Sequence, residues 1–467
     1  MDLYVLDGNL NAVDIISEYK SLIWARRYYN IGDCEVYLPA TEKALRTLQI
    51  GRYIMRRDDR MVCRIRKVEL QTDAETGNYL IITGKDAKDL LDQRIVWELV
   101  TNDGPVETFV RKLITDSMIS PTDSNRTLKK TNGNALLALD TAAGFLEATS
   151  EQVSYKNIGE KIRDYCQTYK WGYEIFLDSA QLKFRMYKGT DRSGTVRFSA
   201  NFDNLAATDY SDDMTNMGNV ALIGGEGEGS ERIMGMSGDA LGIDRYEKFV
   251  DAKDLSRTIT WAELTRIYPT TAQGGEGRLI HDVATDKMLY ELNRVDILVY
   301  NLMQLTWLQT NYPGGTFFTQ NGQDYYRLTY VFIAEIQSGS STPSANEPCT
   351  IYDLVYYTYL INRGAEKLAE FGEVIAFSGS INPDVTFIYK TDYDLGDIVT
   401  ISNELGITAE ARIVEVVEVE DENGYRVEPK FEYIKVVSAE LPPEIITTES
   451  SIALTTEADV ILTTEGA

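Results

Sequence analysis

A glycine-rich stretch is the first candidate for chemistry in this sequence. GGEGEG (224–229) follows a strand-like run, as a phosphate-binding loop would. Its spacing departs from GxGxxG, because Ser230 stands where the last glycine is required. Glu226 and Glu228 would also repel a phosphate. We therefore interpret the stretch as a turning loop and expect no nucleotide.

A serine motif is the second candidate. GMSGD (235–239) nearly forms the nucleophile-elbow pattern GxSxG but ends in Asp239. A nucleophilic serine needs a base, and the only histidine in the chain is His281. No strand–turn–helix pattern surrounds Ser237, so we expect a loop serine. His281-Asp282 is interpreted as a helical surface or packing pair.

Possible metal and redox sites are equally incomplete. Asp7, Asn9 and Asn11 have the spacing of a calcium loop, with Glu18 eleven positions after Asp7. Ala12 occupies the place where that loop needs glycine, so a hairpin turn is expected. The four cysteines are far apart without a CxxC pair, which predicts neither zinc nor disulfides: Cys34, Cys63, Cys166 and Cys349. No cofactor is expected.

The charge balance is strongly acidic, with 46 basic and 72 acidic residues giving −26. Such a field repels phosphate backbones, which argues against sequence-specific nucleic-acid binding. It suits a channel through which DNA slides, and solubility alone would also explain it. No apolar run approaches the ~20 residues that span a bilayer. The N-terminus lacks a basic segment before an apolar one, so we expect cytoplasmic synthesis without a secretory signal.

The chain reads as β, then α/β, then β. Alternation in CEVYLP (34–39) indicates a half-buried strand within a β-rich region 1–98. Helices are expected from Asp86, with Leu90, Leu91 and Ile95 on one face, and from Pro105. Further helices are expected from Asn157 to a stop at Gly172, and over 351–368. The 29 tyrosines can serve either partner contacts or the cores.

Residues 373–437 return to β patterning. Asn423-Gly424 between two alternating runs predicts a hairpin. After Pro442-Pro443 the triplet TTE recurs with a period of eight, at 447–449, 455–457 and 463–465. Such short units cannot bury a core alone, so they form either a tether or strands that pack against neighbouring chains.

Several ordered motifs resemble siphophage tail-hub proteins, which are related to contractile-tail baseplate hubs. The motifs cover about three-quarters of the chain, with 257–350 the poorest match: SLIWARRYYNIGDCEVYLPA (21–40), YLIITGKDAKDLLDQR (79–94), MYKGTDRS (186–193), VALIGGEGEG (220–229) with Arg232, RYEKFVDAKDLS (245–256) and TDYDLGDIVTISNELGITAEARIVEVVEV (391–419).

This resemblance implies an α+β, β-rich fold with two tube-type β-barrel domains, inserted α/β domains and a C-terminal repeat extension. The expected domains are 1–98 as the first tube-type domain, with 190–225 as a candidate completion; 99–189 as an α/β insertion; 226–252 and 372–437 as the second tube-type domain; 253–371 as a mixed insertion; and 438–467 as the extension.

The resemblance also implies a structural role in the virion. A homotrimeric ring would close the tail tube below the distal tail protein, meet the tape measure protein, and anchor a tail fibre or receptor-binding protein. Asp392, Asp394 and Asp397 are candidate acids for the bore, or else turn residues. Related tail proteins often carry a cell-wall hydrolase after the hub, and the sequence leaves no room for one. The alternative is a cell-wall glycosidase or peptidase within 99–190 or 253–371.

Overall fold

A computed structural model describes residues 1–73, 77–199, 204–372, 374–381, 387–402, 407–439, 446–447 and 453–454. The chain forms two compact units, each assembled from three segments. The first unit contains Met1–Tyr19, Tyr29–Tyr187 and Asp213–Val374, and the second contains Lys20–Tyr28, Lys188–Asp212 and Ile375–Ala467. Strands hold 45% of the residues and helices 22%, which confirms a β-rich α/β mixture. The described residues contain no closed barrel.

The first unit opens with an antiparallel sheet in the order β4-β7-β6-β5-β1-β2. Its strands are β1 (Leu3–Leu6), β2 (Ala12–Ile16), β4 (Asp33–Pro39), β5 (Tyr53–Arg56), β6 (Val62–Asp73) and β7 (Gly77–Asp86), with helix α1 (Glu42–Thr47) between β4 and β5. Cys34, Val36 and Leu38 are buried, which confirms the half-buried strand predicted there.

The helix expected from Asp86 is shorter than predicted. Asp86 caps it through the backbone N–H of Lys88, but it is a 3-10 helix, η1 (Ala87–Gln93). Ile95 lies beyond its end and is 41% exposed. The backbone of Val96 exchanges hydrogen bonds with residues 155 and 156, so an extended conformation replaces the next helical turn.

An α/β region follows. It contains β8 (Val100–Pro105), α2 (Val106–Ile114), the π-helix η2 (Thr115–Ile119), the 3-10 helix η3 (Ser124–Arg126), β9 (Leu137–Leu139), β10 (Ala148–Val153), α3 (Ile158–Tyr169), β11 (Gly172–Asp178) and β12 (Gln181–Tyr187). Asn157 caps α3 as predicted, accepting from the Glu160 N–H at 3.1 Å. The predicted stop at Gly172 is wrong. Lys170 ends the helix in a left-handed conformation, and Gly172 begins β11.

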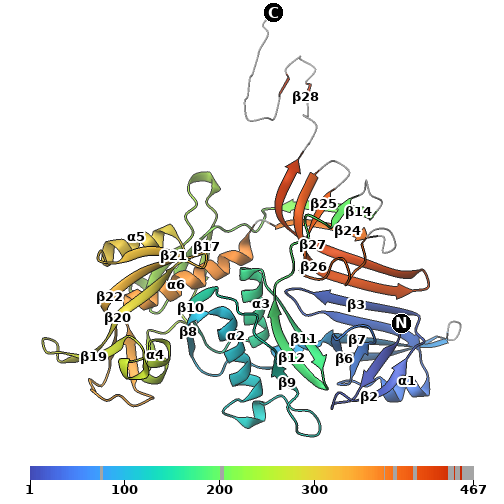
Figure 1. The fold of residues 1–467 in the computed structure, drawn as a ribbon, viewed down its shortest axis with the longest axis horizontal. Coiled ribbons are helices and arrows are strands. Elements are labelled where there is room, and N and C mark those ends of the chain that lie inside the picture. The colour runs from blue at the N-terminus through green and yellow to red at the C-terminus, as the bar shows by residue number, and fades with distance from the viewer. Residues whose placement is uncertain are drawn as a thin grey trace, which may run out of the picture. The chain divides into compact units, whose positions relative to one another are not determined.

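Residues 213–374 complete the first unit around a long helix, α6 (Asp353–Leu368), which packs on a small sheet in the order β16-β15-β17 (Figure 1). The strands of that sheet are β15 (Val220–Gly224), β16 (Met234–Ser237) and β17 (Glu247–Asp251). Tyr356 and Tyr359 of α6 are fully buried, so they belong to the core. The predicted helix 351–368 starts too early, because Ile351 belongs to a strand.

A six-stranded sheet lies against the same core. It contains β18 (Thr258–Thr260), β19 (Gly277–Asp282), β20 (Lys287–Val299), β21 (Thr316–Gln320), β22 (Gln323–Ile336) and β23 (Pro348–Ile351), with helices α4 (Trp261–Ile267) and α5 (Leu302–Asn311). His281 and Asp282 lie on β19, so the helical placement expected for them is wrong.

The second unit is mainly sheet, ordered β14-β24-β27-β26-β3, with β25 pairing both β26 and β13. Its strands are β3 (Ser21–Arg27), β13 (Arg197–Ser199), β14 (Leu205–Asp213), β24 (Val374–Ile381), β25 (Ile398–Ser402), β26 (Ile407–Asp421) and β27 (Gly424–Ala439). The predicted β26–β27 hairpin is present, and its turn is formed by Glu422 and Asn423, with Gly424 as the first residue of β27. Phe198 packs against Tyr393 and Phe431 in its core, with ring centres 5.2 and 5.9 Å apart.

The C-terminal repeat falls mostly outside the described residues. Of its TTE triplets only Thr447 is described, within β28 (Ile446–Thr447), which pairs antiparallel with β29 (Ala453–Leu454). Among the helices that the structure describes, none combines the length and apolar character that a bilayer crossing requires.

Candidate functional site

The acidic turn 391–397 is the site predicted from the family-like motifs. Asp397 is 4% exposed, and its carboxylate accepts hydrogen bonds from the Thr190 N–H and from Arg192 Nε, both at 2.7 Å. It also accepts from the Asp394 N–H at 3.0 Å. Two motifs about two hundred positions apart, 186–193 and 391–419, therefore meet at this carboxylate.

The other two acids also support this turn. Asp392 accepts from the Ile388 N–H at 2.7 Å, and Asp394 forms a 3.2 Å ion pair with Arg26. The Asp394 side chain is 49% exposed, so part of its charge faces solvent.

Two glycines allow the motifs to approach each other. A Cβ on Gly189 would lie 1.9 Å from the carbonyl oxygen of Gly396. Gly396 itself has φ +94°, and a Cβ there would collide with the ring of Tyr28. Backbone contact at this point excludes any larger side chain at either position.

The GGEGEG stretch forms a turn held by its own chain. Arg232 donates to the carbonyl oxygens of Gly224 and Gly225 at 2.8 and 3.1 Å, and the Tyr356 hydroxyl accepts from the Glu226 N–H at 2.7 Å. A Cβ on Gly224 would lie 2.5 Å from the Arg232 guanidinium. The glycines therefore make room for Arg232 and Tyr356, not for a phosphate.

The remaining sequence candidates do not form a reactive group. Ser237 ends strand β16, which corrects the loop placement, and its hydroxyl accepts from Asn301 at 3.4 Å. His281 contacts Asp286 at 2.9 Å instead of a serine. Asp7 accepts from the N–H groups of Asn9 and Asn11, and this confirms a hairpin turn. No cluster of three metal-ligating side chains occurs in the part of the chain that the structure describes.

A buried ionic cluster joins three elements of the first unit. Lys161 of α3 lies 2.7 Å from Glu151 of β10 and 2.9 Å from Glu366 of α6. All three side chains are at most 7% exposed. The Tyr165 hydroxyl contacts Glu151, and Arg363 pairs with Asp254 at 2.9 Å beside the cluster.

The two carboxyl groups of this cluster differ in their proton affinity. Burial and the neighbouring Glu366 charge raise the pKa of Glu151 to about 7. Burial also opposes ionisation of Glu366, but Lys161 and Arg363 outweigh it and hold the pKa of Glu366 below its usual value. The Glu151 carboxyl group therefore gains or loses its proton near neutral pH.

We expect this proton to make stability pH-dependent. The folded state binds the Glu151 proton more tightly than the unfolded state does. The protonated carboxyl therefore contributes fully to the free energy of unfolding below pH 4.5, and this contribution is lost as the pH rises through about 7. Between pH 4.5 and 8, the free energy of unfolding should therefore fall by about 2–3 kcal/mol less in the Glu151→Gln variant than in the wild type. Urea unfolding of both proteins between pH 4.5 and 8 measures it. A constant difference between the two across that window would contradict the assignment.

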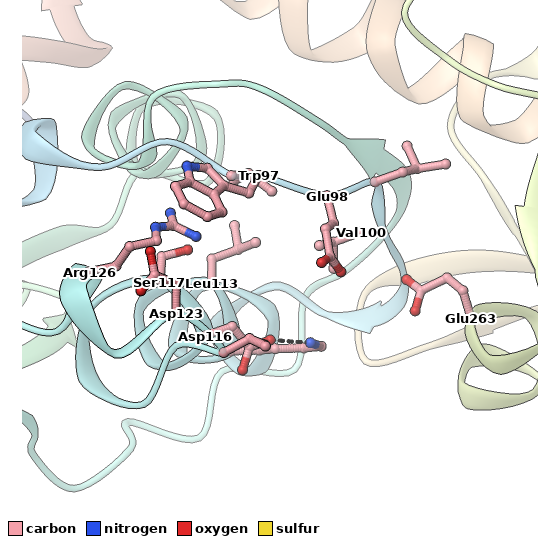
Figure 2. Close-up of a pocket in the computed structure, with 13 residues that line it drawn as sticks. Trp97, Glu98, Val100, Leu113, Asp116, Ser117, Asp123, Arg126 and Glu263 are labelled. Atoms are coloured by element: carbon pink, nitrogen blue, oxygen red, sulfur yellow. Dashed lines mark hydrogen bonds and ion pairs between the residues drawn. The ribbon is translucent and has the colours of Figure 1, made fainter. Parts of the chain in front are cut away.

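A surface cavity of about 310 Å³ lies between the segment 96–100 and the end of α2 (Figure 2). We call it the Trp97 cavity. Its lining is Val96, Trp97, Glu98, Leu99, Val100, Lys112, Leu113, Asp116, Ser117, Thr122, Asp123, Arg126 and Glu263. Lys112 forms an ion pair with Asp116 at its edge. No motif in the sequence pointed to this cavity.

Comparison with known proteins identifies the class of the chain as a siphovirus protein, because residues 2–431 match the model of one such family. The chain belongs to the family described as Siphovirus ReqiPepy6 Gp37-like proteins. This match confirms the resemblance to siphophage proteins that the sequence motifs indicated. Among curated proteins, none matches the sequence.

Three solved structures of tail proteins are similar at low identity. Prophage tail protein gp18 from Listeria monocytogenes is 11% identical with a TM-score of 0.45, covering 94% of this chain and 95% of that one. A tail protein from Neisseria meningitidis is 9% identical with a TM-score of 0.44, covering 92% and 95%. The prophage MuSo2 43 kDa tail protein from Shewanella oneidensis is 8% identical with a TM-score of 0.45, covering 92% and 98%.

Proposed function

We propose that the protein is a structural hub of a phage tail tip, located in the virion and not an enzyme. The observation that carries this proposal is the match of residues 2–431 to a siphovirus protein family. In the proposed assembly, three copies form a ring that closes the tail tube below the distal tail protein. The ring contacts the tape measure protein and anchors a fibre or receptor-binding protein.

The segment order of the second unit supports an architecture of β domains with insertions. Its three segments are separated by residues 29–187 and 213–374, which belong to the first unit. The chain thus leaves the second unit twice and returns to it. We propose two tube-type β domains per copy, one centred on 1–98 and one centred on 372–437. Three copies would then present six comparable modules to a hexameric tube.

The bore of such a ring needs acidic side chains that repel passing DNA. Asp394 is the best candidate within the 391–397 turn, because its side chain is half exposed. Asp392 is a second candidate, and Asp397 serves the turn through Thr190 and Arg192. We also propose that 444–467 packs against neighbouring subunits or another tail protein.

We expect the purified protein to show no peptidoglycan-degrading activity. In the described part of the chain, the motifs that resemble catalytic or phosphate-binding motifs form structural contacts instead, such as the hydrogen bonds from Arg232 to the glycine loop. Zymography on a cell-wall gel, with a known muramidase as positive control, provides the measurement. Clearing that is abolished by mutation of one Asp or Glu would favour the alternative, a cell-wall glycosidase or peptidase.

A further inference from the structure

Trp97 differs in exposure from the other tryptophans. It is 51% exposed and lines the Trp97 cavity, whereas the other four are buried or half-buried: Trp24, Trp171, Trp261 and Trp307. A large aromatic ring left open in a concave site is typical of small-molecule binding sites, where apolar contact area combines with a few placed polar groups.

The indole ring is held in position by its neighbours. The Arg126 guanidinium lies 4.1 Å from the ring centre, and Figure 2 shows the two side chains stacked at one end of the cavity. Arg126 in turn donates to the Ile95 carbonyl oxygen at 2.5 Å, and Arg94 Nε donates to the Arg126 carbonyl oxygen at 2.9 Å. A ring fixed in this way loses little conformational entropy when a ligand binds.

Polar groups in the cavity are open to a ligand. Ser117 is only 4% exposed and lines the cavity, yet its hydroxyl forms no hydrogen bond with any residue that the structure describes. The Glu98 carboxylate and the Thr122 hydroxyl likewise have no hydrogen-bond partner within the described ranges. The Ser117 Oγ atom is reachable from the cavity, so a polar ligand can form a hydrogen bond with it there.

The charges of the lining select the class of ligand. Of the four carboxylates in the lining, Asp116 pairs with Lys112 and Glu263 pairs with Arg266, so Glu98 and Asp123 remain beside one lining cation, Arg126. Carboxylates only accept hydrogen bonds, so the ligand must donate them, and a surplus of acids repels polyanions. Arg126 already lies over the face of the Trp97 ring that a cationic ligand would use, so its charge would repel such a ligand there.

From these features we propose that the Trp97 cavity binds a neutral pyranose unit of a bacterial surface polysaccharide. The apolar face of the sugar packs on the open part of the indole. Its hydroxyl groups donate to Glu98 and Asp123 and form a hydrogen bond with the Ser117 hydroxyl. This binding role goes beyond that of a hub and does not depend on a trimeric ring.

The test uses the full chain on an array of neutral and anionic bacterial oligosaccharides, with tetramethylammonium chloride as a cationic probe. The strongest neutral binder is then titrated by calorimetry and by tryptophan fluorescence. We expect saturable binding of neutral sugars, weakened at least ~tenfold in Trp97→Ala and largely retained in Trp97→Phe. Ser117→Ala should weaken binding several-fold. The matched control Tyr330→Ala, which removes a 66% exposed aromatic ring elsewhere, should bind unchanged.

Three results would overturn the proposal. They are the failure of every neutral oligosaccharide to bind, binding that is equal in wild type and Trp97→Ala, and saturable binding of tetramethylammonium in the same cavity. If Trp97→Ala does not fold, as judged by its unfolding midpoint, Trp97→Phe and Ser117→Ala decide the question. Equal affinity in wild type and Ser117→Ala would then count against the site.

Discussion

Replacing Lys161 with methionine should lower the free energy of unfolding by about 3–5 kcal/mol, because the change leaves Glu151 and Glu366 buried without their shared cation. Methionine keeps the length of the aliphatic stem, so the loss reports charge and not packing. The effect should be largest at pH 8, where Glu151 is most ionised. Urea unfolding monitored by circular dichroism gives the value.

The matched control is Lys67→Met. Lys67 also forms an ion pair, with Glu69 at 2.5 Å, but its side chain is 65% exposed. Exposed pairs contribute little, so the midpoint should barely move. If Lys161→Met were as mild as this control, the buried cluster would not be the link between α3, β10 and α6 that we describe.

Replacing Asp397 with alanine should cost about 3 kcal/mol in the second unit. The change removes the buried carboxylate that accepts from Thr190, Arg192 and Asp394, so three partly buried hydrogen bonds are lost. Hydrogen exchange should rise locally in 188–199 and 390–402, the two segments joined by this carboxylate. Mass spectrometry of the exchanging peptides measures the change.

Asp394→Ala provides the comparison within the same turn. Its carboxylate is 49% exposed and pairs with Arg26, so we expect a loss of at most ~1 kcal/mol. Equal protection of 188–199 in the wild type and in Asp397→Ala would show that the turn holds without its central acid.

Local patterns predicted most of the strands. Alternation in 34–39 and the Asn423-Gly424 pair predict β4 and the β26–β27 hairpin correctly, because period-two burial and turn geometry are local properties. Helix ends were less well predicted. At Ile95 and Ile351, backbone pairing with distant segments replaced the helical hydrogen bonds that the apolar spacing suggested.

The buried ionic cluster left a weak signal in the sequence. Lys161 stands three residues after Ile158 and four before Tyr165, so a charge interrupts the apolar face of α3. Its partners come from β10 and α6, far away in the sequence, and only the fold brings them together. The Trp97 cavity gave no comparable signal, because an exposed tryptophan in an irregular segment has no periodicity.

The stoichiometry of assembled tails tests the central claim most directly. In a cryo-electron microscopy reconstruction of isolated tail tips, we expect three copies of this chain in one closed ring below the distal tail protein. Each copy should contribute two β modules to the wall. A ring of six copies, or a wall with one β module per copy, would contradict the proposed hub.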